Sequence, residues 1–162
     1  MYKKITILAV ITLISDQLSK LLIEANIHLN EAFTIIDDFF WLRYTNNYGA
    51  AWGVFSERTF LLVGVSLVAI LVLIRYINTF SSNKRNIYAF GILLGGITGN
   101  LLDRLFLGYV RDFLSFNIFG YKFPVFNLAD IAIFIGVTLL IYAIIKGEDD
   151  GSKSKPKSKK NR

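Results

Sequence analysis

Four long apolar segments limit what this chain can fold into. They cover roughly residues 4–24, 58–78, 87–107 and 127–146. As α-helices, each is long enough to cross a hydrocarbon core of about 30 Å. Hydrophobic residues make up 54% of the chain, more than an ordinary soluble domain contains. The sequence therefore predicts an all-α membrane protein with four transmembrane helices.

The first segment resembles a secretory signal peptide, because Lys3 and Lys4 precede the apolar run ITILAVITLI. However, Asp16 and Lys20 interrupt that run, and no small-x-small cleavage site follows it. We therefore expect the segment to be retained as a helix, within a single membrane domain that covers residues 1–146.

The positions of Lys and Arg predict the orientation of the helices. Most of these residues fall at the N-terminus, between the second and third segments, and from Lys146 onward. If the helices alternate in direction, all three regions lie on one side, which the positive-inside rule assigns to the cytoplasm. Both termini are then cytoplasmic, and the longer loops, 25–57 and 108–126, face outward.

The tail, residues 147–162, carries several lysines and has no apolar periodicity, so we expect it to be disordered. A basic run directly after an apolar helix more often fixes topology and touches anionic lipid than binds nucleic acid. We therefore expect membrane lipids, and no nucleic acid, among the partners of this chain.

The two outward loops are rich in aromatic residues. The stretches FFWLRYTNNYGAAWGVF and FLSFNIFGYKFPVF alternate partially and contain the turn residues Asn117, Gly120 and Pro124. They predict short strands on the membrane surface, with the aromatic rings at the level of the lipid headgroups. An interfacial aromatic belt with no other role is an equally acceptable interpretation.

The composition excludes several kinds of site. The chain has no cysteine and a single histidine, His28, which excludes disulfides, thiol nucleophiles and Cys/His zinc sites. The sequence contains no H-E-x-x-H or G-x-S-x-G motif. We expect no metal or other cofactor, and we interpret His28 as an interfacial polar residue.

Charged and amide side chains interrupt the apolar segments at one depth. At about 1.5 Å per residue from the cytoplasmic ends, Asp16, Lys20, Asn100, Asp103 and Arg104 all lie in the outer half of the membrane. Such groups are costly in lipid unless they face one another or water. They therefore either pair as structural salt bridges that hold the helices together or surround a functional site.

Small residues recur in the third segment. Gly91, Gly95 and Gly99 are four residues apart, a spacing that permits close helix packing. We expect these glycines to contact a neighbouring helix and to have no further role.

Two further carboxylates, Asp112 and Asp130, lie at the outer ends of the third and fourth segments. Asn127 precedes Asp130 by three residues, so one interpretation is an asparagine helix cap with an acidic residue in the first turn. The other interpretation is a carboxylate pair, in which one group holds a proton while the other acts as a base. The spacing leaves both open.

Five short motifs occur in the order and spacing of a known family. They are DQLSK from Asp16, NNYGAAWG from Asn46, GNLLDR from Gly99, GYVRDF from Gly108 and FPVFNLAD from Phe123. Through these motifs, over residues 10–145, the chain resembles the bacterial lipoprotein signal peptidases (signal peptidase II), a family of aspartic peptidases. Five motifs in register are very specific.

The resemblance implies a four-helix membrane aspartic endopeptidase that cleaves a prolipoprotein just before its diacylglyceryl-modified cysteine. It also implies a small extracytoplasmic β-cradle and an active site near the surface of the outer leaflet. Asp112 and Asp130 match the catalytic pair of the family. The positions that shape or support the site match Asp16, Lys20, Asn47, Asn100, Arg104 and Asn127.

Two features depart from the family pattern. Arg111 stands directly before Asp112, where an apolar residue is typical of the family, and the tail after Lys146 matches nothing in the pattern. We expect a monomer in the bacterial cytoplasmic membrane, because no feature of the chain requires a second copy.

From the residues alone, other classes of function are also open. Intramembrane Asp, Lys and Arg can mark a small transporter or ion pathway, although the second segment and the inner half of the fourth are almost purely apolar. A scaffold whose charges only pair is a third hypothesis. Under that hypothesis, substitution of Asp112 or Asp130 would mainly alter stability.

Overall fold

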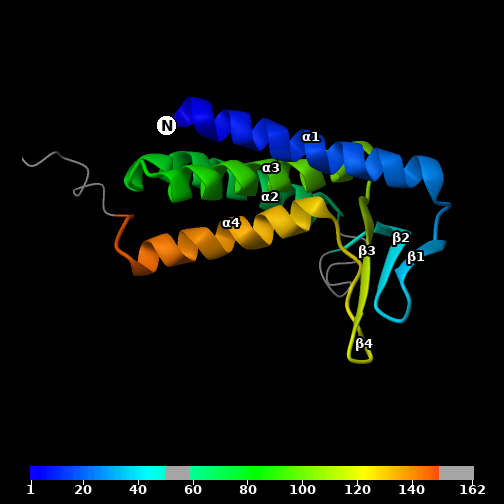
Figure 1. Cartoon of the computed structure of the whole chain (residues 1–162). Coiled ribbons are helices and arrows are strands. Elements are labelled where there is room, and N and C mark those ends of the chain that lie inside the picture. The colour runs from blue at the N-terminus through cyan, green and yellow to red at the C-terminus, as the bar shows by residue number, and fades with distance from the viewer. Residues whose placement is uncertain (50–58, 150–162) are drawn as a thin grey trace, which may run out of the picture.

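The structure is a computed structural model that describes residues 1–49 and 59–149. In this part of the chain, four helices are long and apolar enough to cross a membrane. They pack in one bundle, with the start of α1 and the end of α4 at the same end (Figure 1). The predicted four-helix membrane fold is confirmed. The helices are α1 (Tyr2–Asn26), α2 (Thr59–Tyr76) with the short 3-10 helix η2 (Ile77–Thr79) after it, α3 (Lys84–Phe106) and α4 (Leu128–Ile145).

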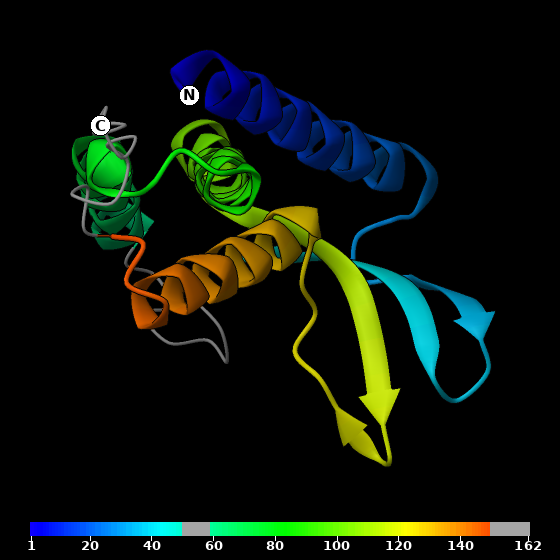
Figure 2. The ribbon, with the colours of Figure 1, turned by 60° about the vertical axis from the view of Figure 1, so that its left-hand side comes forward.

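A small antiparallel sheet extends from the opposite end of the bundle, where α1 ends and α4 begins (Figures 1 and 2). Hairpins β1–β2 and β3–β4 come from the two aromatic loops, so the predicted short strands are present. β2 pairs with β3, and the order is β1-β2-β3-β4. The strands are β1 (Ala32–Ile36), β2 (Phe40–Asn47), β3 (Val110–Ile118) and β4 (Tyr121–Lys122).

Helix α3 lies at the centre of the bundle and contacts each of the other three helices. Its glycines pack as predicted. A side-chain carbon added at Gly95 would lie 2.5 Å from the carbonyl oxygen of Ala9 in α1. At Gly99 an added carbon would meet the Asp16 carboxylate, with Ala129 of α4 close behind. The glycines therefore let α1 and α4 approach α3, and this approach brings polar residues of three helices together.

The segment before α4 is attached to β3. Leu114 and Phe126 form an isolated bridge, in which the Leu114 N–H donates at 2.7 Å and the Phe126 N–H at 3.1 Å. Because Asn127 follows Phe126 directly, this bridge brings the first residues of α4 beside the strand that carries Asp112.

Two sequence predictions concern residues outside the described part of the chain. The tail predicted to be disordered, residues 147–162, is described only to Asp149. Disorder is wrong for its first residues, because Glu148 pairs with Arg85 and accepts from Asn83 Nδ2 at 2.7 Å. The motif NNYGAAWG is described only to Gly49.

Candidate active site

Asp112 and Asp130 meet at the start of α4. Asn127 caps this helix, because its Oδ1 accepts the Asp130 backbone N–H at 3.0 Å, and Asp130 Oδ2 accepts the Asn127 backbone N–H at 3.1 Å. The predicted helix cap is therefore present. The Asn127 side chain also donates through Nδ2 to Asp112 Oδ1 at 2.6 Å. The cap does not exclude a carboxylate pair, since one asparagine bonds to both groups.

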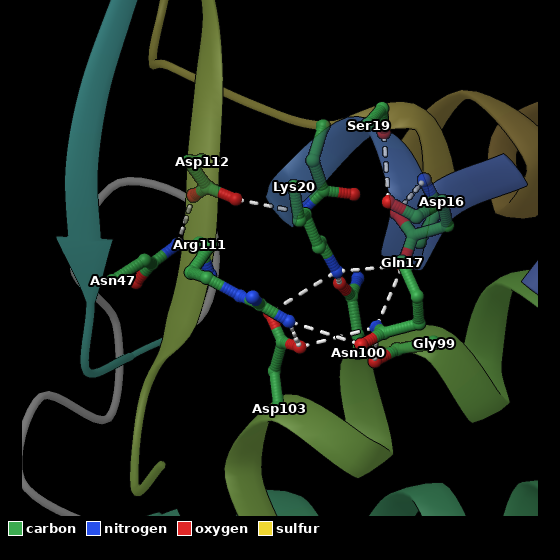
Figure 3. A network of polar contacts seen from close by, with 12 residues as sticks. Asp16, Gln17, Ser19, Lys20, Asn47, Gly99, Asn100, Asp103, Arg111 and Asp112 are labelled. Atoms are coloured by element: carbon green, nitrogen blue, oxygen red, sulfur yellow. Dashed lines mark hydrogen bonds and ion pairs between the residues drawn. The ribbon is translucent and has the colours of Figure 1, made fainter. Parts of the chain in front are cut away.

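Asp112 is 2% exposed and accepts hydrogen bonds on both carboxylate oxygens. Besides Asn127, its partner is Asn47, whose Nδ2 donates to Oδ2 at 2.8 Å (Figure 3). The sheet register creates this contact, since Asp112 pairs with Thr45 in β2 and Asn47 lies two residues further along that strand. Strands β3 and β2 therefore supply the Asp112 carboxylate and one of its hydrogen-bond donors, Asn47.

Asn100 connects the two carboxylates to α1. Its Oδ1 accepts from Lys20 Nζ at 3.0 Å and from Asn127 Nδ2 at 3.1 Å. Its Nδ2 donates to Asp130 Oδ1 at 2.8 Å. Because the Lys20 cation can only donate, it fixes the oxygen end of the amide toward α1 and the NH₂ end toward Asp130.

Asp16, Lys20 and Asp103 form a buried ion cluster behind Asn100 (Figure 3). Lys20 Nζ lies 2.8 Å from Asp16 Oδ2 and 3.3 Å from Asp103 Oδ2. The other oxygen of Asp16 accepts the backbone N–H of Ala129 at 2.9 Å, in the first turn of α4. The salt-bridge interpretation of these three residues is confirmed, and the cluster holds α1, α3 and α4 in place around the site.

Arg104 forms no salt bridge within residues 1–49 and 59–149. Consecutive helix residues point about 100° apart, so Asp103 faces α1 while Arg104 lines the cavity described below. There Arg104 Nη2 donates to the Gly49 carbonyl oxygen at 3.3 Å. No carboxylate in the described part of the chain lies within ion-pair distance of Arg104. Its charge is instead directed into the cavity that Asp112 and Asp130 also line.

A cavity of about 1590 Å³ lies between the sheet, α2, α3 and α4. Both carboxylates and Arg104 belong to its polar lining, whereas α2 and α4 contribute mainly apolar side chains, along α4 as far as Ile141. Pockets for small molecules usually measure about 300–1,000 Å³. This cavity is therefore larger than such pockets, and most of its lining is apolar.

Burial raises the pKa of Asp112 to about 7, and the neighbouring charge of Asp130 acts in the same direction. The hydrogen bonds from Asn47 and Asn127 stabilise the ionised form and oppose the shift without cancelling it. A carboxyl group that titrates near neutral pH can hold or release a proton, as general acid–base catalysis requires.

The order of these residues along the chain matches one known family. The family model described as Signal peptidase (SPase) II matches residues 8–146. The chain belongs to the signal peptidase II family. It is therefore a bacterial membrane enzyme, a hydrolase of the aspartic-peptidase type, as the sequence predicted. The transporter and scaffold hypotheses find no support in this membership.

Relatives of the signal peptidase II family are similar over nearly their whole length. The lipoprotein signal peptidase of Moorella thermoacetica is 43% identical over 140 residues, which cover 86% of this chain and 91% of that protein. The lipoprotein signal peptidase of Staphylococcus aureus (strain bovine RF122 / ET3-1) is 37% identical and covers 95% of this chain and 93% of its own. A solved structure described as a bacterial membrane enzyme superposes with a TM-score of 0.78 at 32% identity, covering 98% of this chain and 94% of that chain.

The sequence did not indicate four residues behind the site: Gln17, Glu24, Tyr44 and Arg111. Gln17 and Glu24 share a face of α1 with Lys20, and this helical spacing was the available signal. The sequence marked Arg111 only as a departure from the family pattern. Strand alternation, which directs its side chain away from Asp112, was the available signal for its position.

In residues 1–49 and 59–149, no three His, Asp or Glu side chains are grouped to hold a metal ion. His28 is exposed.

We expect the stability of Asp112→Asn relative to the parent signal peptidase to rise with pH. The raised pKa means that the folded protein binds more protons than the unfolded chain between about pH 4 and about pH 7. The contribution of Asp112 to stability is fully present below about pH 4 and is lost as the pH rises to about 7, at about 1.4 kcal/mol per pH unit. Asparagine does not titrate. The difference in Tm should therefore move in favour of the variant between about pH 5 and about pH 8, and a constant difference would contradict the raised pKa.

Proposed function

We propose that this protein removes the signal peptide from diacylglyceryl-modified prolipoproteins, with Asp112 and Asp130 as its catalytic pair. The observation that best supports the pair is a single cavity lined by both carboxylates, together with one asparagine, Asn127, that bonds to both residues. The bond that is cleaved is the amide directly before the lipid-modified cysteine.

One carboxyl group of the pair acts as the general base and the other as the general acid. The ionised carboxylate takes a proton from a water molecule, whose oxygen attacks the carbonyl carbon of the scissile amide. The protonated carboxyl donates a hydrogen bond to the carbonyl oxygen, and a proton passes to the amide nitrogen as the C–N bond breaks. One water is consumed, the signal peptide leaves with a new carboxyl terminus, and the mature lipoprotein keeps a new amino terminus. The pair then holds one proton again.

Amide side chains keep the pair in a fixed geometry. Asn47 and Asn127 donate to Asp112, and Asn100 donates to Asp130. Each donor is itself held: Asn100 by the Lys20 cation, and Asn127 by its place as the helix cap. We assign supporting roles, in the cavity or behind it, to Arg104, Asp16 and Lys20.

The apolar part of the cavity suits a substrate that stays in the membrane. Along α4, the lining from Asp130 to Ile141 extends about 16 Å at the helical rise, which fits the apolar segment of a signal peptide or the lipid chains. The Lys and Arg distribution assigns both termini to the cytoplasm, so the carboxylates lie near the outer leaflet. The enzyme acts there as a monomer.

A cleavage assay with purified protein tests this function. A diacylglyceryl-modified prolipoprotein should yield a mature protein that begins with the modified cysteine, as read by mass spectrometry. The unmodified prolipoprotein should be cleaved about tenfold or more slowly, because the lipid supplies binding energy away from the reacting bond. A metal chelator should leave the rate unchanged. Equal cleavage of both substrates would contradict the lipid requirement, and no cleavage of either would contradict the function.

A further inference from the structure

Behind the strands that carry Asp112 and Asn47 lies a second polar cluster, on the side facing α1. Side chains of a strand alternate in direction, and Arg111, directly before Asp112, points away from the cavity and toward α1 and α3. Tyr44 of β2 also extends toward α1. Neither Arg111 nor Tyr44 lines the cavity.

Arg111 is 5% exposed and bonds through its backbone and its entire guanidinium. Asp103 accepts from the Arg111 backbone N–H at 3.0 Å, from Nε at 3.3 Å and from Nη2 at 2.8 Å (Figure 3). Nη1 lies 2.9 Å from Glu24 Oε2, and Nη2 donates to Gln17 Oε1 at 3.0 Å. One carboxylate of α3 therefore holds both the main chain and the side chain of the residue next to Asp112.

Glu24 connects both central strands to the last turns of α1. Its Oε1 accepts the Tyr44 hydroxyl at 3.2 Å, while Oε2 bonds to Arg111. Burial, reinforced by the Glu24 charge, raises the pKa of Tyr44 further above neutral pH, and the protonated hydroxyl donates to Glu24. Tyr44 precedes Asn47 by three residues and Arg111 precedes Asp112 by one. Glu24 therefore holds both strands close to the groups they present to the cavity.

The charges make this arrangement sensitive to the loss of Arg111. Asp103 shares its two cations, Lys20 and Arg111, with other carboxylates, and in the described part of the chain Glu24 pairs with Arg111 alone. Arg111 and Asp103 are both buried, so removing Arg111 leaves Asp103 to share the Lys20 cation with Asp16. Glu24, whose side chain is 39% exposed, is left without a cation within the described residues. Without the Arg111 side chain, β3 therefore loses its ion pairs to α1 and α3 directly beside Asp112.

We propose that Arg111, Glu24 and Tyr44 form a rear clamp, in which Arg111 is a positioning residue that holds Asp112 at its working distance from Asp130. This inference rests on the proposed function of the carboxylate pair. In this chain Asp103 and Glu24 supply the two carboxylates that Arg111 meets behind the strand.

Substitution of Arg111 tests the clamp through the rate of the chemical step. Arg111→Met retains much of the side-chain volume but removes all five donors. We expect kcat to fall roughly 10- to 100-fold, since a displacement of about 1 Å is that costly. KM should change by less than about threefold, because the cavity lining is untouched. Arg111→Lys should recover only part of the loss, since an ammonium cannot replace the bidentate fork.

Two milder variants and one control complete the test. Tyr44→Phe and Glu24→Gln should each lower kcat about 3- to 10-fold while folding normally. Arg43→Met is the matched control, because Arg43 is exposed on β2 and forms no ion pair within the described residues. Its kcat should equal that of the parent. If Arg111→Met and Tyr44→Phe both retain kcat within about twofold per folded molecule, the inference is overturned.

The clamp and the proposed function fail in distinguishable ways. If the parent cleaves and Asp112→Asn does not, full activity of both Arg111→Met and Tyr44→Phe overturns only the clamp. An inactive parent instead overturns the proposed function. A double-mutant cycle of Arg111→Met and Glu24→Gln, measured by thermal unfolding, tests the contact between Arg111 and Glu24 independently of enzymatic activity. The two losses of Tm should combine to less than their sum in the double variant. Strictly additive losses would overturn the clamp.

Discussion

Asp112→Asn and Asp130→Asn should each lower kcat for cleavage of a lipid-modified prolipoprotein by about 10²- to 10⁴-fold, the contribution typical of a general acid or base. Asparagine keeps the size of the side chain but can neither take the proton of the attacking water nor return one to the amide nitrogen. Each variant should remain folded, because the oxygen of the new asparagine can still accept from one of the two donors that the carboxylate meets. The measurement is single-turnover cleavage with purified protein at equal folded concentration.

The matched control for this pair is Asp37→Asn, since Asp37 is exposed in the turn between β1 and β2. It should cleave at the parental rate. Full processing by either Asp112→Asn or Asp130→Asn would remove that residue from the catalytic pair. Loss of cleavage together with loss of folding would instead indicate the structural role that the scaffold hypothesis gives to these carboxylates.

Lys20→Met should destabilise the protein by about 3–5 kcal/mol, the usual cost of removing one partner from a buried ion pair. Lys20 is fully buried and contacts Asp16, Asp103 and the Asn100 amide oxygen. Without the cation, the buried Asp16 carboxyl lies at the junction of three helices with no positive partner within the described residues. Equilibrium unfolding in mixed detergent micelles measures the loss.

A second substitution separates the charge effect from the loss of packing. In the Lys20→Met background, Asp16→Asn should restore part of the stability, because it removes the unpaired charge. Lys122→Met is the control on an exposed strand residue and should leave stability unchanged. Equal stability of Lys20→Met and Lys122→Met would show that the buried cluster contributes nothing to the fold.

Asn100 and Asn127 connect Lys20 to the two carboxylates, and so connect the two predictions above. Asn100 accepts from Lys20 and donates to Asp130, and Asn127 donates both to Asn100 and to Asp112. The buried cation therefore orients the amide groups that orient the carboxylates. Lys20→Met should for this reason also reduce cleavage, through the altered direction of the Asn100 side chain.

Much of the fold could be predicted from local sequence patterns. Helix length follows from the length of each apolar run, and the short strands follow from the alternating aromatics around Trp41 and Phe116. The five motifs also indicated that Asp112, Asp130 and Asn127 belong near one another. Two interpretations of Asn127 were open in the sequence, and the structure shows that the cap is real while the same side chain reaches Asp112.

The partners of the charged groups were harder to predict. The sequence placed Asp103 beside Arg104, but the structure pairs Asp103 with Lys20 and Arg111 and turns Arg104 into the cavity. Arg111 is the clearest case, because its partners lie eight residues away in α3 and 87 residues away in α1. No local spacing encodes such contacts.

The sequence by itself determined the four membrane helices and the strands in the aromatic loops, because length, apolar content and alternation act within a segment. Only the tertiary structure decided which group each charge meets. Those pairings depend on how closely α1 and α4 approach α3 across Gly95 and Gly99, and on the register of β2 against β3. The helix approach and the strand register each depend on segments far apart in the chain. They determine which groups side chains such as Arg104 and Arg111 contact.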